Sequence, residues 1–276
     1  LHDALPISNP GLGTIKQYKT LAQFVERAKN SPDDLPGVLC KDFNVREVSA
    51  SVWLSYEAIK SDLRFELADV YNTYAIGGCD LSATTDLTAA TLLIRKPDDP
   101  IVYVLQQYFL PEKRIEHLED KNTNEAPYRR WAERGLLTIC PGNRVDYSMV
   151  TAWFCQMRDE WKIDAVKVGY DRALAGYWVD EMKSNGYDME AVAQGPYTWS
   201  QPMREMGAAL EGKTVNYDGN PVLVWCLTNT GVKKSGLNNI QPVKITEKRR
   251  IDGMVSLLNA WVVYVKHYED FMYNVG

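Results

Sequence analysis

Residues 74–90, YAIGGCDLSATTDLTAA, constrain the fold more than any other stretch of the 276-residue chain. An apolar segment with two glycines ends abruptly on Asp80, and a Ser/Thr-rich turn leads into a second apolar run. This pattern predicts two buried strands joined by a short turn. Two glycines inside a strand often mark close approach by another backbone or a ligand, and a carboxylate at the end of a rigid strand suits metal ligation.

Two later stretches also place a carboxylate at the end of a predicted element. The strand AVKVGYD ends on Asp171, and the helix in RRIDGMVSLLNAW begins at Asp252. Each aspartate also has an ordinary interpretation: Asp80 as a turn residue, Asp171 as a helix cap, and Asp252 as a complement to the helix dipole. Our hypothesis is that the three side chains converge and bind divalent metal for phosphodiester hydrolysis.

The order of the predicted elements indicates an α/β fold. Residues 74–110 have the pattern of an antiparallel three-stranded meander, and helices alternate with strands after residue 125. Such alternation predicts βαβ units with parallel strands, so we expect a mixed sheet with helices on its faces. We expect residues 1–72 to form a helical or irregular lead-in and residues 73–276 to form the main domain.

Three segments outside the meander carry further predictions. Apolar spacing in TLAQFVERAKN predicts an early helix, and SQPMREMGAALEG predicts a later one with Ser200 as its N-cap. Residues 214–246, rich in Asn, Gly and Lys, have the pattern of hairpins or an insertion, and residues 249–266 form the last predicted helix.

Composition limits the class of protein and of metal site. The longest nearly apolar run, residues 254–265, is too short to span a membrane, which takes about 20 residues. Five scattered cysteines without a C-x-x-C pair favour a reducing, cytoplasmic location. Three histidines without an i, i+4 pair favour an oxygen-rich Mg²⁺ or Mn²⁺ site over zinc. The chain lacks an initiator Met, so we interpret it as a fragment whose first eight residues need not be native.

Three ordered motifs resemble the nuclease domain of the large terminase subunit of tailed bacteriophages. GGCDLSATTDLTA is similar to the first acidic motif of that family, VGYD to the second, and RRIDGMVSLLNA to the third. The resemblance extends from about residue 9 to residue 267. It implies a ribonuclease H-like α/β domain, with a mixed β-sheet flanked by helices on both faces.

The resemblance also implies an activity and a site. It implies a metal-dependent endonuclease that cuts concatemeric viral DNA during packaging, with Asp80, Asp171 and Asp252 as catalytic metal ligands. Asp86 lies where some members have an additional acidic residue, and is a secondary metal candidate. Two Mg²⁺ or Mn²⁺ ions, roughly 4 Å apart, would activate water and stabilise the leaving 3′ oxygen.

The resemblance also implies binding partners for the chain. These are double-stranded DNA, the small terminase subunit, a portal and an upstream ATPase motor, all in the host cytoplasm. No G-x-x-x-x-G-K-[ST] sequence is present, so the chain itself has no P-loop. A net charge of −5 counts against tight, independent DNA binding.

Five basic residues are candidates for contacts with DNA phosphates. The run Lys248, Arg249 and Arg250 precedes the third motif, and Lys233 and Lys234 lie in the Asn/Gly-rich segment. Such contacts position DNA without reading its sequence. The ordinary interpretation of the run is a solvated surface patch.

Two other functions stay open from the residues alone. One is another ribonuclease H-like DNA enzyme, of the junction-resolvase or transposase type, which would prefer branched DNA or transfer strands. The other is a non-catalytic assembly module that docks on a portal or motor. Such a module would use its acids in turns and caps, and would bind no Mn²⁺.

Overall fold

The computed structural model describes residues 18–30, 51–121, 126–172, 176–236, 238–246 and 249–276. The chain divides into two compact units, Leu1–Ser51 and Val52–Gly276. The described part of the first unit includes helix α2 (Tyr18–Asn30), which confirms the early helix predicted from apolar spacing. Residues 52–72 belong to the second unit, and the division into residues 1–72 and 73–276 stays a prediction.

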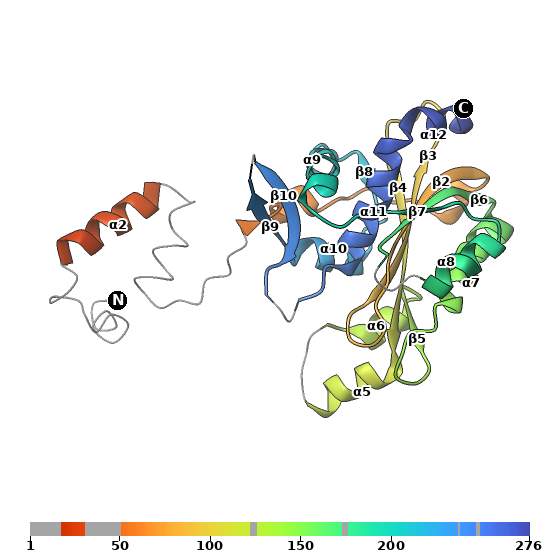
Figure 1. Ribbon diagram of the computed structural model, residues 1–276, viewed down its shortest axis with the longest axis horizontal. Helices are drawn as coiled ribbons and strands as arrows, with labels where there is room; N and C mark the ends of the chain where they lie inside the picture. Colours follow the sequence, from red (N-terminus) through yellow and green to blue (C-terminus); the bar gives the residue numbers. More distant parts are fainter. Residues whose placement is uncertain (1–17, 31–50, 122–125, 173–175, 237, 247–248) are drawn as a thin grey trace. The chain divides into compact units, whose positions relative to one another are not determined.

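The second unit is built on a mixed sheet of seven strands within the described residues. The strands lie in the order β5-β4-β3-β2-β6-β7, and β8 pairs with β4 (Figure 1). Strand β3 pairs antiparallel with both β2 and β4, which confirms the predicted meander. The predicted parallel pairing is confirmed by β6 on β2 and β7 on β6. The bounds are β2 (Thr73–Asp80), β3 (Thr88–Arg95), β4 (Val102–Pro111), β5 (Leu137–Cys140), β6 (Ile163–Tyr170), β7 (Met189–Ala191) and β8 (Val215–Asn216).

The parallel pairing of β2 with β6 decides where two candidate aspartates lie. Cys79 on β2 is the register partner of Tyr170 on β6. Asp80 and Asp171 are the residues that follow, so they stand at the same edge of the sheet on neighbouring strands. A pairing that is distant in sequence thus brings the first two acidic motifs together.

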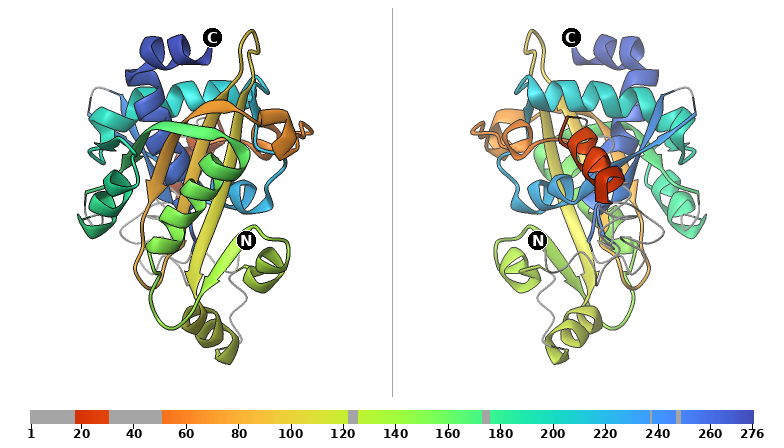
Figure 2. Two further views of the ribbon diagram at one scale, coloured as in Figure 1. Left: turned by 90° about the vertical axis from the view of Figure 1, so that its right-hand side faces the viewer. Right: turned by 90° about the vertical axis from the view of Figure 1, so that its left-hand side faces the viewer.

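Helices cover both faces of the sheet, as predicted (Figures 1 and 2). Side chains from α9 (Pro196–Glu211), α10 (Pro221–Thr228) and α11 (Asp252–Lys266) form one core with the sheet. Side chains from α7 (Ser148–Trp161) and α8 (Gly176–Ser184) form the other. Strand β3 contributes Leu93 to the first core and Leu92 and Ile94 to the second. It is therefore buried on both faces, which explains its continuous apolar sequence.

Shorter elements complete the second unit. They are α4 (Tyr56–Ile59), α5 (Glu112–Asp120), α6 (Tyr128–Glu133), α12 (Tyr268–Val275) and a 3₁₀ turn at Leu67–Val70. A second sheet has the order β1-β9-β10, with β1 (Ser51–Val52), β9 (Thr230–Ser235) and β10 (Asn239–Lys244). Among the described residues, no helix is both long and apolar enough to cross a membrane.

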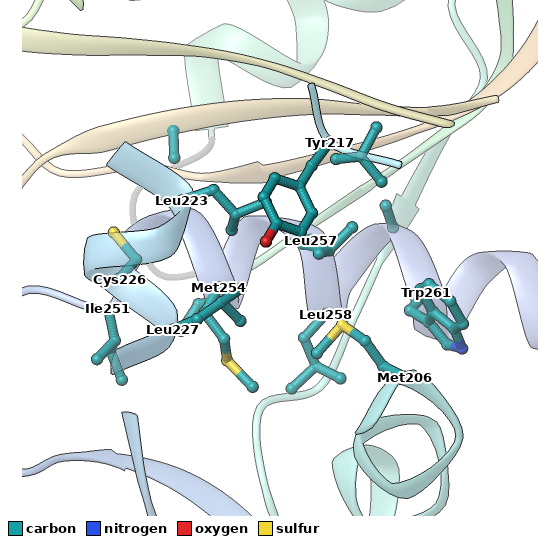
Figure 3. Close-up of a cluster of buried hydrophobic side chains, with 14 of the residues drawn as sticks. Met206, Tyr217, Leu223, Cys226, Leu227, Ile251, Met254, Leu257, Leu258 and Trp261 are labelled. Atoms are coloured by element: carbon teal, nitrogen blue, oxygen red, sulfur yellow. The ribbon is translucent and has the colours of Figure 1, made fainter. Parts of the chain in front are cut away.

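Helix α11 lies at the centre of the larger core (Figure 3). Met254, Leu257 and Leu258 are fully buried, and they lie among side chains from α9 and α10 together with Tyr217. Every residue from Asp252 to Trp261 is buried. A helix enclosed on all sides loses the polar face of a surface helix, and this explains the nearly uniform apolar sequence of α11.

The backbone of α11 crosses β2 and β6 at very short range. A Cβ atom on Gly78 would lie 2.6 Å from the amide nitrogen of Ala260. A Cβ atom on Gly169 would lie 2.7 Å from the carbonyl oxygen of Asn259. Real side chains do not tolerate contacts this short with backbone atoms, so both positions require glycine. The expectation that the glycine pair before Asp80 marks a close backbone approach is confirmed at Gly78.

Of two predictions for the C-terminal half, one is only partly confirmed and the other is wrong. The segment predicted as hairpins or an insertion contains helix α10, whose N-cap Asn220 accepts hydrogen bonds from the amides of Val222 and Leu223. Its remainder does form the β9–β10 hairpin. Ser200 is not an N-cap, because α9 already begins at Pro196. The Ser200 hydroxyl accepts a hydrogen bond from the Ile240 amide and so ties α9 to β10.

We expect Gly78→Ala to lower the free energy of unfolding by about 1–3 kcal/mol, because its methyl group would overlap the α11 backbone. Urea unfolding in EDTA, followed by circular dichroism, measures the change. Gly176→Ala is the control, since a Cβ at Gly176 has no neighbour within 4 Å among the described residues. Equal unfolding midpoints for the two variants would contradict the close packing of α11 on β2.

Candidate functional site: an acidic pocket at the strand ends

A pocket of about 360 Å³ lies where β2 ends and α11 begins. Three carboxylates line it, from Asp80, Asp86 and Asp252. Lys244, the last residue of β10, lines it as well, together with Trp199 of α9. The pocket therefore collects side chains from four segments that are far apart in sequence.

Asp80 is the last residue of the central strand β2, and this strand fixes its position. The two residues before it are tied to α11, because Ser256 donates its hydroxyl to the Gly78 carbonyl at 3.0 Å and Asn259 donates its amide to the Cys79 carbonyl at 2.9 Å. These two bonds exist because α11 lies so close to the strand. They fix the last backbone atoms before the Asp80 side chain.

Asp252 is the first residue of α11 and is only 5% exposed. The next carbonyl, that of Gly253, accepts a hydrogen bond of 2.8 Å from the Gln106 side chain on β4. A side chain at Gly253 would collide with the Tyr108 ring, so glycine is required there too. The Asp252 Oδ2 atom is buried and has no hydrogen-bond partner among the described residues. A buried, unsatisfied carboxylate oxygen is costly without a cation or donor to complete it.

A buried polar network lies beneath the pocket and joins three strands to α11. The Gln106 amide also donates to the Thr91 hydroxyl at 2.8 Å, and that hydroxyl lies 2.6 Å from the Ser256 hydroxyl. Tyr108 donates to the Gln106 carbonyl oxygen. Fully paired networks of this kind hold one arrangement of the elements they join. The relative position of β2 and the α11 N-terminus is therefore set by hydrogen bonds as well as by packing.

Asp171 follows the last residue of β6 and is partly exposed. It is close enough to Asp80 for its charge to raise the pKa of the Asp80 carboxyl. The pocket lining includes Asp80, Asp86 and Asp252 without Asp171. The structure thus places Asp171 at the same edge of the sheet as Asp80, on the neighbouring strand, and outside the pocket lining.

Asp86 is held by two cations. Lys244 Nζ lies 2.6 Å from one of its carboxylate oxygens, and Arg250 Nη1 lies 2.8 Å from the other. Its backbone amide donates to the Ser82 hydroxyl, which is turn chemistry of the kind expected for this loop. Asp86 therefore serves as a turn residue and as an acid of the pocket.

The carboxylates of the pocket repel one another. Burial raises the pKa of Asp80 well above its ordinary value, and the charges of Asp252, Asp171 and Asp86 raise it further. Burial also raises the pKa of Asp252, followed by the charge of Asp86. Lys244 opposes both pKa shifts. A divalent cation would relieve the same repulsion more strongly, because carboxylate oxygens are the ligands that hard cations prefer.

The lining residues of the pocket have the right donor atoms for a metal ion, but their present positions do not form a coordination site. Within the described ranges, no group of three His, Cys, Asp or Glu side chains is spaced to hold a metal ion. The donor set is nevertheless oxygen-only, and Asp252 offers a buried oxygen without a partner. Coordination of a metal ion by these residues would therefore require side chains to rotate. In the present arrangement Asp86 is paired with Lys244 and Arg250.

The predicted DNA-contact residues do not all share one location. Lys233 and Lys234 are exposed on β9, and Arg249 is exposed ahead of α11. Arg250 is 7% exposed and pairs with Asp86, a residue of the pocket lining, but does not itself line the pocket. Lys248 lies outside the described residues.

Lys244 and Trp199 are among the lining residues that the sequence analysis missed. Lys244 ends the strand in NIQPVK, and the only available signal was a basic residue at a strand end. Trp199 directly precedes the helix predicted to begin at Ser200, and the structure includes it in α9. Neither residue has a pattern that would have pointed to the acidic motifs.

The strand order, the crossing helix α11 and the acidic edge define a ribonuclease H-like domain. The chain belongs to the family "Terminase large subunit, endonuclease domain", whose model matches residues 3–268. The resemblance drawn from the three acidic motifs is confirmed, and so is the expected fold class.

Two curated relatives cover most of the chain. The large terminase subunit of Enterobacteria phage HK97 is 29% identical over 257 residues, which are 91% of this chain and 49% of that protein. Protein YmfN of Escherichia coli (strain K12) is 26% identical over 264 residues, which are 92% of this chain and 57% of that protein. The chain spans about half the length of these relatives.

Solved structures agree with the fold. The crystal structure of the HK97 bacteriophage large terminase matches with a TM-score of 0.65 and 25% identity, over 95% of this chain and 54% of that one. The large terminase nuclease from thermophilic phage G20c matches with a TM-score of 0.51 and 11% identity, over 76% of this chain and 97% of that one. The second match covers nearly all of an isolated nuclease.

In EDTA, we expect the Asp252 carboxyl to contribute a decline in the free energy of unfolding as the pH rises from roughly 4 to about 7. Folding raises the pKa of Asp252 to about 7, whereas an unfolded aspartate titrates near roughly 4. Between these values the Asp252 carboxyl binds its proton more strongly in the folded chain than in the unfolded chain, so its contribution to stability declines with pH. Urea titrations at a series of pH values measure the slope.

Two variants isolate the contribution of this carboxyl. Asp252→Asn cannot ionise, so its stability should decline less than that of the wild type over the same pH range. Asp98→Asn, at an exposed turn position, should keep the wild-type slope. Identical slopes for Asp252→Asn and the wild type would refute the raised pKa.

Proposed function

We propose that this chain is a metal-dependent DNA endonuclease that cuts concatemeric viral DNA during genome packaging. The observation that carries the proposal is the meeting of Asp80 and Asp252 in one pocket, with Asp171 on the neighbouring strand. Membership of the terminase endonuclease family supports the reaction class. In the part of the chain that the structure describes, no comparable feature favours junction resolution or strand transfer.

In this proposal Asp80, Asp171 and Asp252 are the catalytic metal ligands, and Asp86 is an additional ligand. Two bound Mg²⁺ or Mn²⁺ ions would supply an activated water and charge stabilisation for the leaving 3′ oxygen. The residues of the chain hold their oxygens on rigid elements, since β2 and α11 are joined by Ser256 and by the other hydrogen bonds beneath the pocket. Such support keeps the ligands close to the productive geometry.

Phosphate contacts come from exposed cations. Lys233, Lys234 and Arg249 are exposed and suit sequence-independent contacts with the DNA backbone, and Lys248 is proposed alongside them. Arg250 contributes through Asp86, since its guanidinium group is committed to that carboxylate. Because the whole chain carries a net charge of −5, we expect DNA binding to depend on bound metal.

The partners follow from the relatives. The HK97 large terminase is about twice the length that this chain matches, and we propose that an upstream ATPase motor occupies the remainder in the intact protein. The small terminase subunit and the portal are further proposed partners, and the host cell cytoplasm is the proposed location.

We expect the wild type to convert supercoiled plasmid to open and linear forms in Mn²⁺, and to leave it intact in EDTA. Asp80→Asn should reduce the rate by at least roughly 100-fold, because it removes a charged ligand while keeping the side-chain volume. Agarose-gel time courses measure the rate. Asp98→Asn, an exposed turn variant, should cleave like the wild type.

Two results would contradict the assignment. One is equal nicking by Asp80→Asn and the wild type. The other is the absence of any calorimetric Mn²⁺ binding by the wild type, which would favour the non-catalytic assembly module. Circular dichroism of each variant excludes simple unfolding as the cause of lost cleavage.

We expect the double variant Lys233→Ala, Lys234→Ala to bind DNA more weakly and with a smaller salt dependence. Each phosphate contact contributes about one unit to the slope of log affinity against log salt concentration. Fluorescence anisotropy with a labelled duplex in Ca²⁺ measures both quantities across sequences. A slope equal to that of the wild type would exclude these lysines from the DNA contact.

A further inference from the structure

Lys244 is the one pocket cation that combines a fixed backbone with a side chain reaching solvent, among the described residues. Its backbone is paired with the buried residue Thr230 across the β9–β10 hairpin (Figure 1). The following residue, Ile245, donates its amide to the Asn229 carbonyl at 3.0 Å. The Lys244 side chain is about 30% exposed. The fixed end of β10 therefore places the ammonium group in the pocket, where it is paired with Asp86 and its side chain is partly exposed to solvent.

Arg250 is held more tightly on the same carboxylate. Its side chain is about 8% exposed, and its carbonyl accepts a hydrogen bond from the Asn229 side chain. Asn229 thus supports the backbone on both sides of the loop that carries the two cations. A planar guanidinium group in a buried site is a permanent partner, whereas an ammonium group on a flexible stem can leave.

We propose that Lys244 is a resident counter-ion of the acidic pocket, which competes with divalent metal for the carboxylates. This inference rests on the proposed function and adds a control on its metal loading. In the metal-free chain, the ammonium group lowers the repulsion among Asp80, Asp86 and Asp252. When divalent cations enter, the same charge opposes them, and the ion pair with Asp86 opens.

A purely structural role for Lys244 makes a different prediction. If the ion pair only joined the β9–β10 hairpin to the loop at Asp86, its loss would lower the free energy of unfolding by the same amount with and without metal. A competing counter-ion instead makes the loss depend on metal. The affinity for metal and the stability without metal should change in opposite directions.

The test is calorimetric titration of the full chain with Mn²⁺ alone, at fixed pH and low ionic strength. We expect Lys244→Met to bind Mn²⁺ roughly ten-fold more tightly than the wild type, because one positive charge has left the site. Lys244→Arg keeps the charge, and its guanidinium group leaves a carboxylate less readily than an ammonium group, so it should bind Mn²⁺ no more tightly than the wild type. Lys60→Met is the control for loss of one charge, since Lys60 is exposed and does not line the pocket.

Thermal unfolding gives a second readout on the same samples. In EDTA, Lys244→Met should melt below the wild type, and saturating Mn²⁺ should raise its melting temperature more than that of the wild type. If the variant is unfolded in EDTA, Mn²⁺ should refold it, as seen by circular dichroism. Failure to recover in Mn²⁺ would overturn the inference.

The affinities separate the possible failures. Equal or weaker Mn²⁺ binding by Lys244→Met, beside measurable binding by the wild type, overturns the counter-ion role alone. No Mn²⁺ binding by the wild type overturns the proposed nuclease function and this inference with it. Tighter binding by Lys60→Met to the same degree would reduce the effect to overall charge and would also overturn the inference.

Discussion

The close approach of α11 to β2 and β6 is the constraint on which the site depends. Without side chains at Gly78 and Gly169, the helix backbone lies directly against the strands. At that distance Ser256 and Asn259 reach the strand carbonyls, so packing and hydrogen bonding fix the same relation between the two elements. Asp80 and Asp252 stand at the ends of these elements. Their mutual position is therefore a property of the core.

The core also sustains an unfavourable charge arrangement. Burial and mutual repulsion raise the pKa values of Asp80 and Asp252, which means that their ionised forms destabilise the folded chain. One turn further along α11, Met254, Leu257 and Leu258 are fully buried. Each such side chain contributes about 1.5–3 kcal/mol by leaving water, and this burial opposes the repulsion at the first residue of the helix. The acids are kept together because apolar neighbours hold their elements.

Local pattern was sufficient for much of the fold and for part of the site. Apolar runs with polar boundaries predicted that a strand ends at Asp80 and that a helix begins at Asp252, as observed. The short turns between the first three strands of the main domain predicted the meander. Helix α10 was missed because PVLVWCLT is apolar throughout and rich in β-branched residues, so it has no helical period to detect. The pairing of Asp86 with Lys244 was out of reach, because 158 residues separate them and either residue alone reads as an ordinary turn or strand end.

The positive charges of the site divide into two kinds with different consequences. Arg250 and Lys244 are ion-paired with Asp86, a carboxylate of the pocket lining, so they offset carboxylates and add little attraction at long range. Lys233 and Lys234 are exposed on β9, the strand that pairs with the one ending at Lys244. A single hairpin thus carries both the cations proposed for phosphate contacts and the cation proposed to oppose metal. Because its two strands are held in one register, a shift of this hairpin would move both sets of charges together. Under the proposed function, such a shift would couple metal loading to DNA contact.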